Sequence, residues 1–285
     1  MSDLPKATAH ERARLSEQDD ELRKIVAASR RIVFFGGAGV STESGIPDFR
    51  SESGLYSARA EYGHSPEYLV SRAAFERETE LFYRYYRACL LHPEAKPNPA
   101  HYALAQLEAS GRLAAVVTQN VDGLHQLAGS KAVHELHGSV HRNVCVQCGA
   151  RYDLAYFLDK AHCHGLKDDS TGTDAGTDAG MGAGMGARSE ICRCASCGGI
   201  VKPDVVLYGE QLDPQVLQAA CDAVGHADTL IVGGTSLVVY PAAGLVGLFK
   251  GKRLVVINIG TTERDQQACL VIHRPIGEVL STLCA

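Results

Sequence analysis

The sequence predicts an α/β fold built on a Rossmann-like, doubly wound parallel sheet. Four short apolar runs, too short for helices, are typical of strands that are buried on both faces. Each run ends in small or polar residues, and helical segments separate the runs, which favours parallel strands. The runs are residues 32–35, 113–117, 229–232 and 254–257. Ligands of such sheets bind at the carboxyl ends of the strands, where the small polar residues of this chain are expected.

A glycine-rich turn follows the first predicted strand. The strand stops at Gly36 and Gly37, and Gly39 belongs to the same turn. Glycine adopts positive φ and has no side chain to hold a ligand away, so backbone N–H groups can approach a phosphate. The match to the dinucleotide-binding fingerprint is imperfect, because Thr42 stands where the third glycine belongs. Taken alone, the turn is also compatible with an ordinary strand-to-helix connection.

Helices are predicted before and between the strands. An amphipathic helix starts at Glu17, after a tail without apolar periodicity, and leads into the first strand. Asn98 and Pro99 indicate a helix start, with Asn as the N-cap and Pro at the first helical position, and Gly111 is a natural stop. Residues 64–92 are predicted to form further helices.

The length of 285 residues suits two domains, or one large domain with an inserted module. We expect a Rossmann-like large domain, a helical module and a zinc-binding module. The large domain takes residues 17–50, 98–140 and 204–285, the helical module takes residues 51–97, and the zinc-binding module takes residues 141–203.

The composition disfavours several function classes. With a formal charge of −5, the chain lacks the basic face that general nucleic-acid binding requires. No run of about 18 apolar residues is present, so no membrane-spanning segment is expected. The polar, acidic N-terminus does not resemble a signal peptide. Ten cysteines in a chain of this length favour metal binding or thiol chemistry over disulfides, and we expect a reducing, cytoplasmic location.

Two C-x-x-C-G units of identical spacing interrupt the strand–helix pattern. The first contains Cys145 and Cys148, and the second contains Cys194 and Cys197. Four thiolates at this spacing can close a tetrahedral site, which predicts one structural Zn²⁺ per chain. The alternatives are a redox pair, which usually occurs as a single C-x-x-C, and free buried cysteines. Cys192 is a spare thiol, but only Cys194 with Cys197 reproduces the two-residue spacing.

Residues 165–190 form a glycine-rich insertion between the two cysteine units. The sequence TDAG occurs twice in succession there, followed by MGAG and MGAR. With so little apolar bulk, the segment cannot offset the entropy of ordering, and we expect it to be disordered. His162, Cys163 and His164 precede the insertion and have side chains that can bind a metal, although adjacent ligands rarely reach one ion well.

A set of motifs over residues 20–280 resembles the sirtuin family of NAD-dependent protein deacylases, in the family's order. The motifs are GAGVS at 37–41, SGIPDFR at 44–50, TQNVDGLH at 118–125, ELHG at 135–138, the two C-x-x-C units, KPDVVLYGE at 202–210, GTSLVVYP at 234–241 and IN at 257–258. The resemblance implies a Rossmann-like large domain and a small domain made of the zinc and helical modules. It places NAD in the cleft between them, with acyl-lysine entering from the opposite side.

The resemblance also implies which residues contact NAD. In this sequence they are Gly37, Ala38, Gly39, Thr42, Phe49, Arg50, Gln119, Asn120, Val121, Asp122, Gly234, Thr235, Ser236 and Asn258. The residue types suit these roles. Arg50 is a fork-shaped phosphate donor, and Asn120 and Asp122 can bind a carboxamide and order a water molecule.

His137 and Asn120 are the implied catalytic residues. In the implied reaction, the acyl oxygen attacks C1′ of the ribose as nicotinamide leaves, and a ribose hydroxyl then loses its proton. A neutral imidazole is a suitable base near pH 7. Water finally releases free lysine and 2′-O-acyl-ADP-ribose, and each turnover consumes one NAD.

The peptide substrate is expected to add a strand between two facing segments, so that recognition depends mainly on backbone hydrogen bonds. The predicted contacts are Val206, Tyr208, Gly209, Val238 and Tyr240. Family members that prefer succinyl or malonyl groups resemble one another in a Tyr-x-x-Arg motif. This chain has Tyr83-x-x-Tyr86, with Arg87 one position out of register. We therefore expect an acetyl or another neutral acyl group.

Other functions compete with this interpretation. A protein mono-ADP-ribosyltransferase would use the same NAD site, but the motif histidine, His137, is present. A non-catalytic NAD-responsive binding module predicts a defective site, whereas Asn120, Asp122 and Arg50 are also in place. A dehydrogenase fits less well, because no acidic residue ends a second strand about 20 positions after the glycines. Acyl-lysine proteins are the expected partners, without a membrane or a specific nucleic acid.

Overall fold

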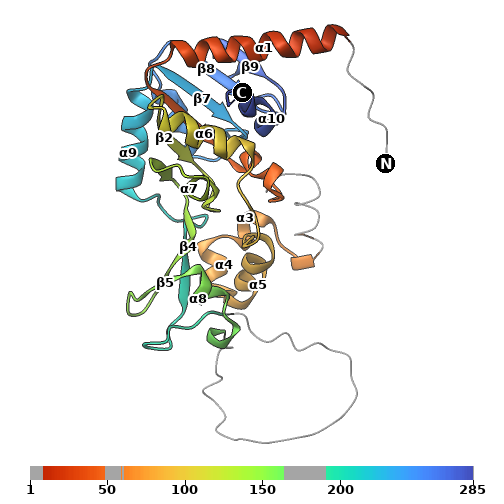
Figure 1. Ribbon diagram of the computed structural model, residues 1–285. Helices are drawn as coiled ribbons and strands as arrows, with labels where there is room; N and C mark the ends of the chain where they lie inside the picture. The colour runs from red at the N-terminus through yellow and green to blue at the C-terminus, as the bar shows by residue number, and fades with distance from the viewer. Residues whose placement is uncertain (1–8, 49–58, 60, 164–190, 285) are drawn as a thin grey trace, which may run out of the picture. The chain divides into compact units, whose positions relative to one another are not determined.

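Figure 1 shows the computed structural model, which forms two compact units. The described residues are 9–48, 59, 61–163 and 191–284. Unit 1 takes its described residues from 1–57, 92–138 and 211–285, and unit 2 takes them from 58–91 and 139–210. The predicted contacts Phe49 and Arg50 and the predicted disorder of residues 165–190 lie outside the described residues.

Unit 1 is built on a six-stranded sheet of order β3-β2-β1-β7-β8-β9, and all its strand pairs are parallel. The strands are β1 (Ile32–Gly36), β2 (Leu113–Thr118), β3 (Val133–Glu135), β7 (Thr229–Gly233), β8 (Arg253–Ile257) and β9 (Leu270–Ile272). The four predicted strands and the parallel sheet are confirmed. The edge strands β3 and β9 escape prediction because three residues are too few to give an apolar pattern.

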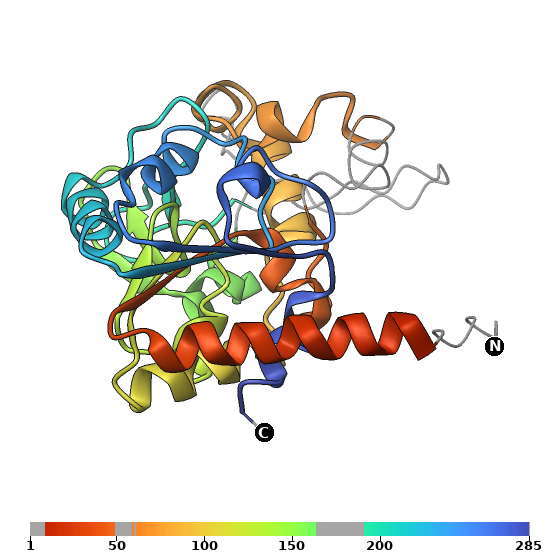
Figure 2. The ribbon, with the colours of Figure 1, turned by 90° about the horizontal axis from the view of Figure 1, so that it is seen from above.

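Helices pack on both faces of this sheet, as a doubly wound fold requires. The helical elements of unit 1 are α1 (Ala9–Ala28), η1 (Ala38–Val40), η2 (Thr42–Ser44), α6 (Pro99–Ala109), α7 (Leu124–Leu127), α9 (Pro214–Gly225), η4 (Ala242–Leu248), η5 (Asp265–Gln267) and α10 (Ile276–Ser281). Neighbouring side chains of β1 point to opposite faces: Phe34 packs in one cluster with α1, α6 and α10, and Phe35 packs in the other with α9 and η4. Figure 2 shows α1, in red, running along one side of the sheet. None of the helices among the described residues is long and apolar enough to cross a bilayer.

Helix α1 corrects the expected start at Glu17, because it begins at Ala9. Its first half contains good helix formers such as Arg14 and Leu15 but no apolar stripe, so periodicity alone does not reveal it. Its second half buries Leu22, Ile25 and Val26 against the sheet, as predicted.

Helix α6 begins at Pro99 with a capping box, which confirms the predicted start. The Asn98 side chain accepts from Ala100 N at 2.9 Å, and the His101 ring accepts from Asn98 N at 3.2 Å. Asn98 Nδ2 also donates to Val40 O at 2.7 Å and to Ser44 Oγ at 3.0 Å. The cap of α6 therefore also holds the turn that follows β1.

Unit 2 combines helices with a three-stranded sheet of order β5-β4-β6. Its elements are α3 (Pro66–Leu69), α4 (Arg72–Arg77), α5 (Thr79–Cys89), β4 (Gly138–Cys145), β5 (Arg151–Asp153), α8 (Leu154–Leu158), η3 (Lys160–His162) and β6 (Val201–Val205). The helices predicted within residues 64–92 are confirmed. The core is aromatic: Tyr83 and Tyr86 are fully buried, and the ring of Tyr83 stacks on Phe157 with 5.8 Å between centroids.

The four predicted zinc ligands gather in unit 2, with their sulfur atoms within 4.8 Å of one another. Cys145 Sγ lies 3.5 Å from Cys197 Sγ, and Cys148 Sγ lies 3.6 Å from Cys194 Sγ. A tetrahedral zinc with Zn–S bonds of about 2.3 Å separates its sulfurs by about 3.8 Å, so the cluster fits the ion. Tyr152 Oη lies 2.9 Å from Cys194 Sγ, and this hydrogen bond lowers the pKa of the Cys194 thiol to about 6. With four thiolates, the site is closed and structural.

Replacing Asn98 by Ala should lower the free energy of unfolding by about 2–3 kcal/mol. The change removes the N-cap of α6 and leaves the buried Val40 carbonyl without its donor. Urea unfolding followed by circular dichroism measures the effect. Gln106→Ala, on the exposed side of the same helix, is the matched control and should change stability by less than about 0.5 kcal/mol. Equal stabilities of the two variants would contradict this role of the cap.

Replacing Cys148 by Ser should reduce bound zinc from about one ion per chain to nearly none, because a thiolate ligand is lost. Cys148 is exposed, so the substitution removes little packing of its own. Zinc content by atomic absorption after dialysis gives the result. Cys269→Ser, at an exposed cysteine of unit 1, should keep the full zinc content. Full retention of zinc by the Cys148→Ser protein would show that the cluster is not the binding site.

Candidate active site

The candidate site lies at the carboxyl ends of three adjacent strands of unit 1. Gly36, the last residue of β1, pairs with Thr118 of β2 on one side and with Gly233 of β7 on the other. The segments that follow these strands therefore start side by side at one edge of the sheet. Parallel sheets bind their ligands at this edge.

The turns after β1 and β7 touch through their backbones. Gly39 N donates to Gly234 O at 2.8 Å. A Cβ added at Gly39 would lie 2.8 Å from Gly234 Cα, and one added at Gly234 would lie 2.4 Å from Val40 N. Gly234 also has a φ of 60°, which L side chains disfavour. Both glycines are thus required for the two turns to approach each other.

Asn120 and Asp122, at the end of β2, are joined through a hydroxyl of the glycine turn. Asn120 Nδ2 donates to Ser41 Oγ at 3.0 Å, and Ser41 Oγ donates to Asp122 Oδ2 at 2.6 Å. The other oxygen of Asp122 accepts at 2.9 Å from the backbone N of Leu124, the first residue of α7. Ser41 is almost fully buried and was not among the predicted site residues. A hydroxyl in a glycine turn opposite two polar strand-end residues is the signal that could have identified it.

Gln119 connects β2 to the turn after β7. Its Nε2 donates to Thr235 Oγ1 at 3.1 Å, and Thr235 Oγ1 also accepts from Leu237 N at 3.2 Å. Its backbone N donates to Gly36 O at 3.0 Å, which continues the β1–β2 ladder by one residue. Gln119 therefore holds a fixed backbone position beside β1.

His137 follows β3 and is oriented by Gln119. Its Nδ1 lies 3.0 Å from Gln119 O. A carbonyl oxygen can only accept, so Nδ1 carries the proton and Nε2 keeps its lone pair. Desolvation lowers the pKa of His137 below its ordinary value of 6.5 and outweighs the opposing effect of the hydrogen bond to Gln119. The imidazole is therefore neutral at pH 7 and offers Nε2 as a base.

Two other histidines of unit 1 are unsuited to that role. His101 and His125 are fully buried, with 4.7 Å between their ring centroids. Desolvation lowers the pKa of His101 to about 4 and that of His125 to about 3. His101 already serves the capping box of α6. Burial thus separates these two histidines from substrate chemistry.

The remaining predicted NAD contacts of unit 1 follow the same strand ends. Ala38, Thr42 and Val121 belong to the segments after β1 and β2, and Ser236 and Asn258 come after β7 and β8. Thr42 and Ser236 are exposed. Asn258 N donates to Ile272 O, which fixes the position of Asn258 against β9. Their contact with NAD stays a prediction.

The predicted peptide-binding residues fall in both units. Val206, Tyr208 and Gly209 belong to unit 2, and Val238 and Tyr240 belong to unit 1. Tyr208 N donates to Val70 O and Tyr208 O accepts from Arg72 N, so its backbone already pairs within unit 2. The side chains of Tyr208, Val238 and Tyr240 are exposed and apolar in large part.

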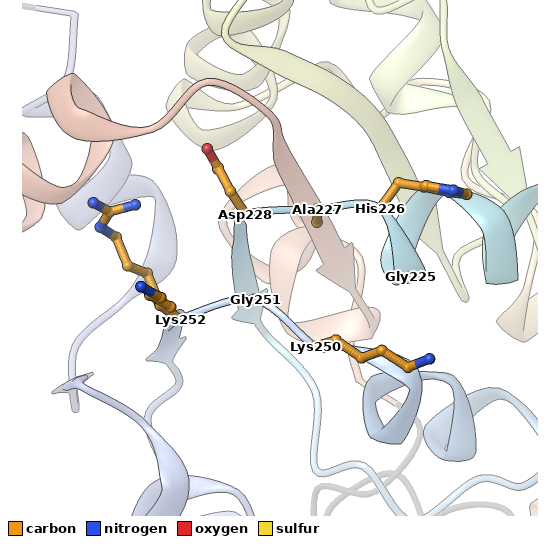
Figure 3. Close-up of a pocket in the computed structure, with 8 residues that line it drawn as sticks. Gly225, His226, Ala227, Asp228, Lys250, Gly251 and Lys252 are labelled. Atoms are coloured by element: carbon orange, nitrogen blue, oxygen red, sulfur yellow. The ribbon is translucent and has the colours of Figure 1, made fainter.

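A hollow lies at the opposite edge of the sheet from the candidate site. Figure 3 shows its lining, which is Gly225, His226, Ala227, Asp228, Lys250, Gly251, Lys252 and Arg253. Arg253 is the first residue of β8 and the other residues precede β7 or β8, so the hollow lies at the amino ends of these strands. Asp228 accepts hydrogen bonds from Arg30 N and Arg31 N, and it belongs to the connection into the sheet.

Known proteins resemble this chain over almost its whole length. The sequence model of the Sir2 family matches residues 37–241. An NAD-dependent protein deacetylase of Clostridium acetobutylicum is 52% identical over 269 residues, which cover 94% of this chain and 99% of that protein. An NAD-dependent protein deacetylase of Cutibacterium acnes is 45% identical, and the alignment covers 93% of this chain and 96% of that protein.

Solved structures of Sir2 enzymes have a similar fold over most of this chain. One that describes the mechanism and regulation of Sir2 enzymes has a TM-score of 0.76 at 37% identity, over 94% of this chain and 96% of its own. A Sir2 structure with a p53 peptide and NAD⁺ has a TM-score of 0.73 at 34% identity, over 91% and 94%. Fold, motifs and identity agree, and the chain belongs to the Sir2 family.

Proposed function

We propose that the protein is an NAD-dependent protein lysine deacetylase that releases nicotinamide, 2′-O-acyl-ADP-ribose and free lysine. The observation that carries the proposal is the neutral, oriented His137 beside the network of Asn120, Ser41 and Asp122. Two relatives that are 52% and 51% identical to this chain in sequence are named NAD-dependent protein deacetylases. A Sir2 structure at 34% identity contains 2′-O-acetyl-ADP-ribose and a deacetylated p53 peptide.

NAD would be held by the strand-end residues of unit 1. Gly39 and Gly234 let the turns after β1 and β7 approach each other, and polar groups from the ends of β1, β2 and β7 converge nearby. Small residues and hydrogen-bond donors at the carboxyl edge of a parallel sheet fit a dinucleotide. NAD supplies a ribose carbon with a good leaving group, and the protein supplies the orientation and the base.

His137 would remove a proton from a ribose hydroxyl through Nε2. The Nδ1 proton stays on the ring and remains hydrogen-bonded to Gln119 O during this step, so the ring keeps its orientation as it becomes charged. The hydrogen bond to the carbonyl stabilises the resulting imidazolium. Asn120 would bind the carboxamide of nicotinamide, with its side chain fixed by Ser41. Asp122 anchors the same hydroxyl and orders the segment.

The acyl group is proposed to be acetyl or another neutral group. Tyr83 donates its hydroxyl to Val201 O at 2.6 Å and is fully buried. Arg87 Nη2 donates to Phe157 O at 2.8 Å and to Cys163 Sγ at 3.0 Å. Because Tyr83 and Arg87 already bind groups in the core of unit 2, we expect no strong binding site for the carboxylate of a succinyl or malonyl group. Acyl-lysine proteins are the proposed partners, and the need for four reduced zinc ligands supports a cytoplasmic location.

Replacing His137 by Ala should lower kcat/KM for deacetylation at least about 100-fold, because the base is lost. Mass spectrometry of an acetyl-lysine peptide incubated with protein and NAD measures nicotinamide, deacetylated peptide and O-acetyl-ADP-ribose together. The three products should appear in equal amounts with the unaltered protein. His141→Ala, at an exposed histidine of β4, is the control and should retain the activity.

Two outcomes would contradict this function. NAD consumption while the peptide stays acetylated would contradict it, as would a protein that gains the mass of ADP-ribose. Either result would instead indicate an ADP-ribosyltransferase.

A succinyl-lysine peptide should have a kcat/KM at least about tenfold lower than the acetyl-lysine peptide, because its carboxylate would be desolvated without a cationic partner. Competition between the two peptides, followed by mass spectrometry, measures the ratio directly. A propionyl-lysine peptide controls for size, since it lengthens the acyl chain without adding charge. Equal or faster removal of the succinyl group would overturn the predicted acyl preference.

A further inference from the structure

Two cysteines outside the zinc cluster face each other in unit 2. Cys163 and Cys192 form an isolated antiparallel bridge. Arg193 N donates to His162 O at 2.8 Å, which makes the two cysteines a non-hydrogen-bonded pair. In such a pair the Cα atoms lie about 4.5 Å apart and the side chains project to the same face. Disulfides span Cα separations of roughly 4.4–6.8 Å, so the pair is suitably placed for one.

The two thiols have different surroundings. Cys192 is fully buried, and Cys163 is partly exposed. Arg87 Nη2 donates to Cys163 Sγ at 3.0 Å. The guanidinium is held in place by Phe157, whose carbonyl accepts from Nη2 at 2.8 Å and whose ring centroid lies 4.7 Å from Cζ. A guanidinium favours the thiolate, which is the reactive form, so Cys163 is the cysteine that reacts first.

Both cysteines lie on fixed backbone. Cys163 follows η3, and its N–H donates to Lys160 O at 3.1 Å. Cys192 O accepts from Val201 N of β6 at 2.9 Å, and the next residue, Arg193, bridges Ile200. The bridge therefore brings the two sulfur-bearing residues together without a change of backbone conformation.

We propose that Cys163 and Cys192 form a reversible disulfide, separate from the zinc ligands, with a low-molecular-weight disulfide as the oxidant. The Cys163 thiolate attacks one sulfur of the oxidant, which forms a mixed disulfide and releases one small thiolate. Cys192 transfers its proton to that thiolate, and its sulfur attacks Cys163 Sγ and displaces the second small thiolate. The protein is oxidised by two electrons, and the oxidant is reduced to two thiol equivalents.

The disulfide would close residues 164–191 into a covalent loop. A cross-link of this kind restricts the unfolded chain, and it would tie η3 to the segment that leads into the second cysteine unit. Intracellular disulfides are usually transient and redox-sensing, which agrees with a reversible bond. The proposal does not depend on the deacetylase function, because its readout is a covalent bond.

Peptide mapping of the full-length, zinc-loaded protein tests the proposal. The protein is incubated with oxidised glutathione, free thiols are alkylated, and the digest with trypsin is analysed by mass spectrometry. Trypsin gives the peptides 161–167 and 189–193, each with one cysteine, while Cys194 and Cys197 fall on a later peptide. We expect the first two peptides to be joined, to separate with dithiothreitol, and the zinc content to stay unchanged.

Matched variants sharpen the test. Cys163→Ser should abolish the cross-link, and Cys192→Ser should leave glutathione attached to peptide 161–167. Cys284→Ser, at an exposed cysteine of unit 1, should leave the cross-link intact. Arg87→Gln should slow alkylation of Cys163 by about fivefold, because the thiolate loses its guanidinium. An unchanged alkylation rate would overturn the role of Arg87.

Two results would overturn the disulfide itself. One is glutathione that stays on Cys163 of the unaltered protein without a cross-link to peptide 189–193. The other is a cross-link from Cys163 or Cys192 to Cys194 or Cys197 with release of zinc, which would assign the thiol chemistry to the metal cluster instead.

Discussion

The candidate site depends on the backbone contact between Gly39 and Gly234. The parallel register of β1 with β7 ends at Gly36 and Gly233, so the turns that follow must share one small space. The hydrogen bond from Gly39 N to Gly234 O is possible only because neither residue has a Cβ. A side chain at either position would push one turn away from the other. It would then displace Ser41 on one side and Thr235 on the other.

Two unrelated parts of the chain reinforce this contact. Asn98 caps α6 and, with the same side chain, binds Val40 O and Ser44 Oγ, so the helix start and the glycine turn are fixed together. Gln119 binds Thr235 Oγ1 from the end of β2. The site is therefore a set of short side chains that hold neighbouring loops. Little reorganisation is needed when a ligand enters such a site, which is how preorganised sites stabilise developing charge.

Much of this arrangement could be predicted from the sequence, because apolar runs and turn residues act locally. The four long strands, the start of α6 and the four clustered cysteines follow from pattern and spacing. The true start of α1 could not, since polar helix formers leave no stripe. The place of Ser41 in the candidate site could not be predicted either, because it depends on hydrogen bonds with Asn120 and Asp122, about 80 positions away in sequence. The backbone hydrogen bonds of Tyr208 to Val70 and Arg72 could not be predicted from the sequence, because they join segments that are distant in the chain.

The orientation of His137 has the same origin. In many active sites a carboxylate fixes the tautomer of the histidine, and a search for Asp or Glu can reveal the pair. Here the acceptor is the carbonyl of Gln119. That carbonyl is positioned because Gln119 N binds Gly36 O, which extends the ladder between β1 and β2. The tautomer is therefore set by the register of the sheet. It follows that the side chain of Gln119 can bind Thr235 while its backbone carbonyl binds His137, so one residue orders both the turn after β7 and the imidazole ring.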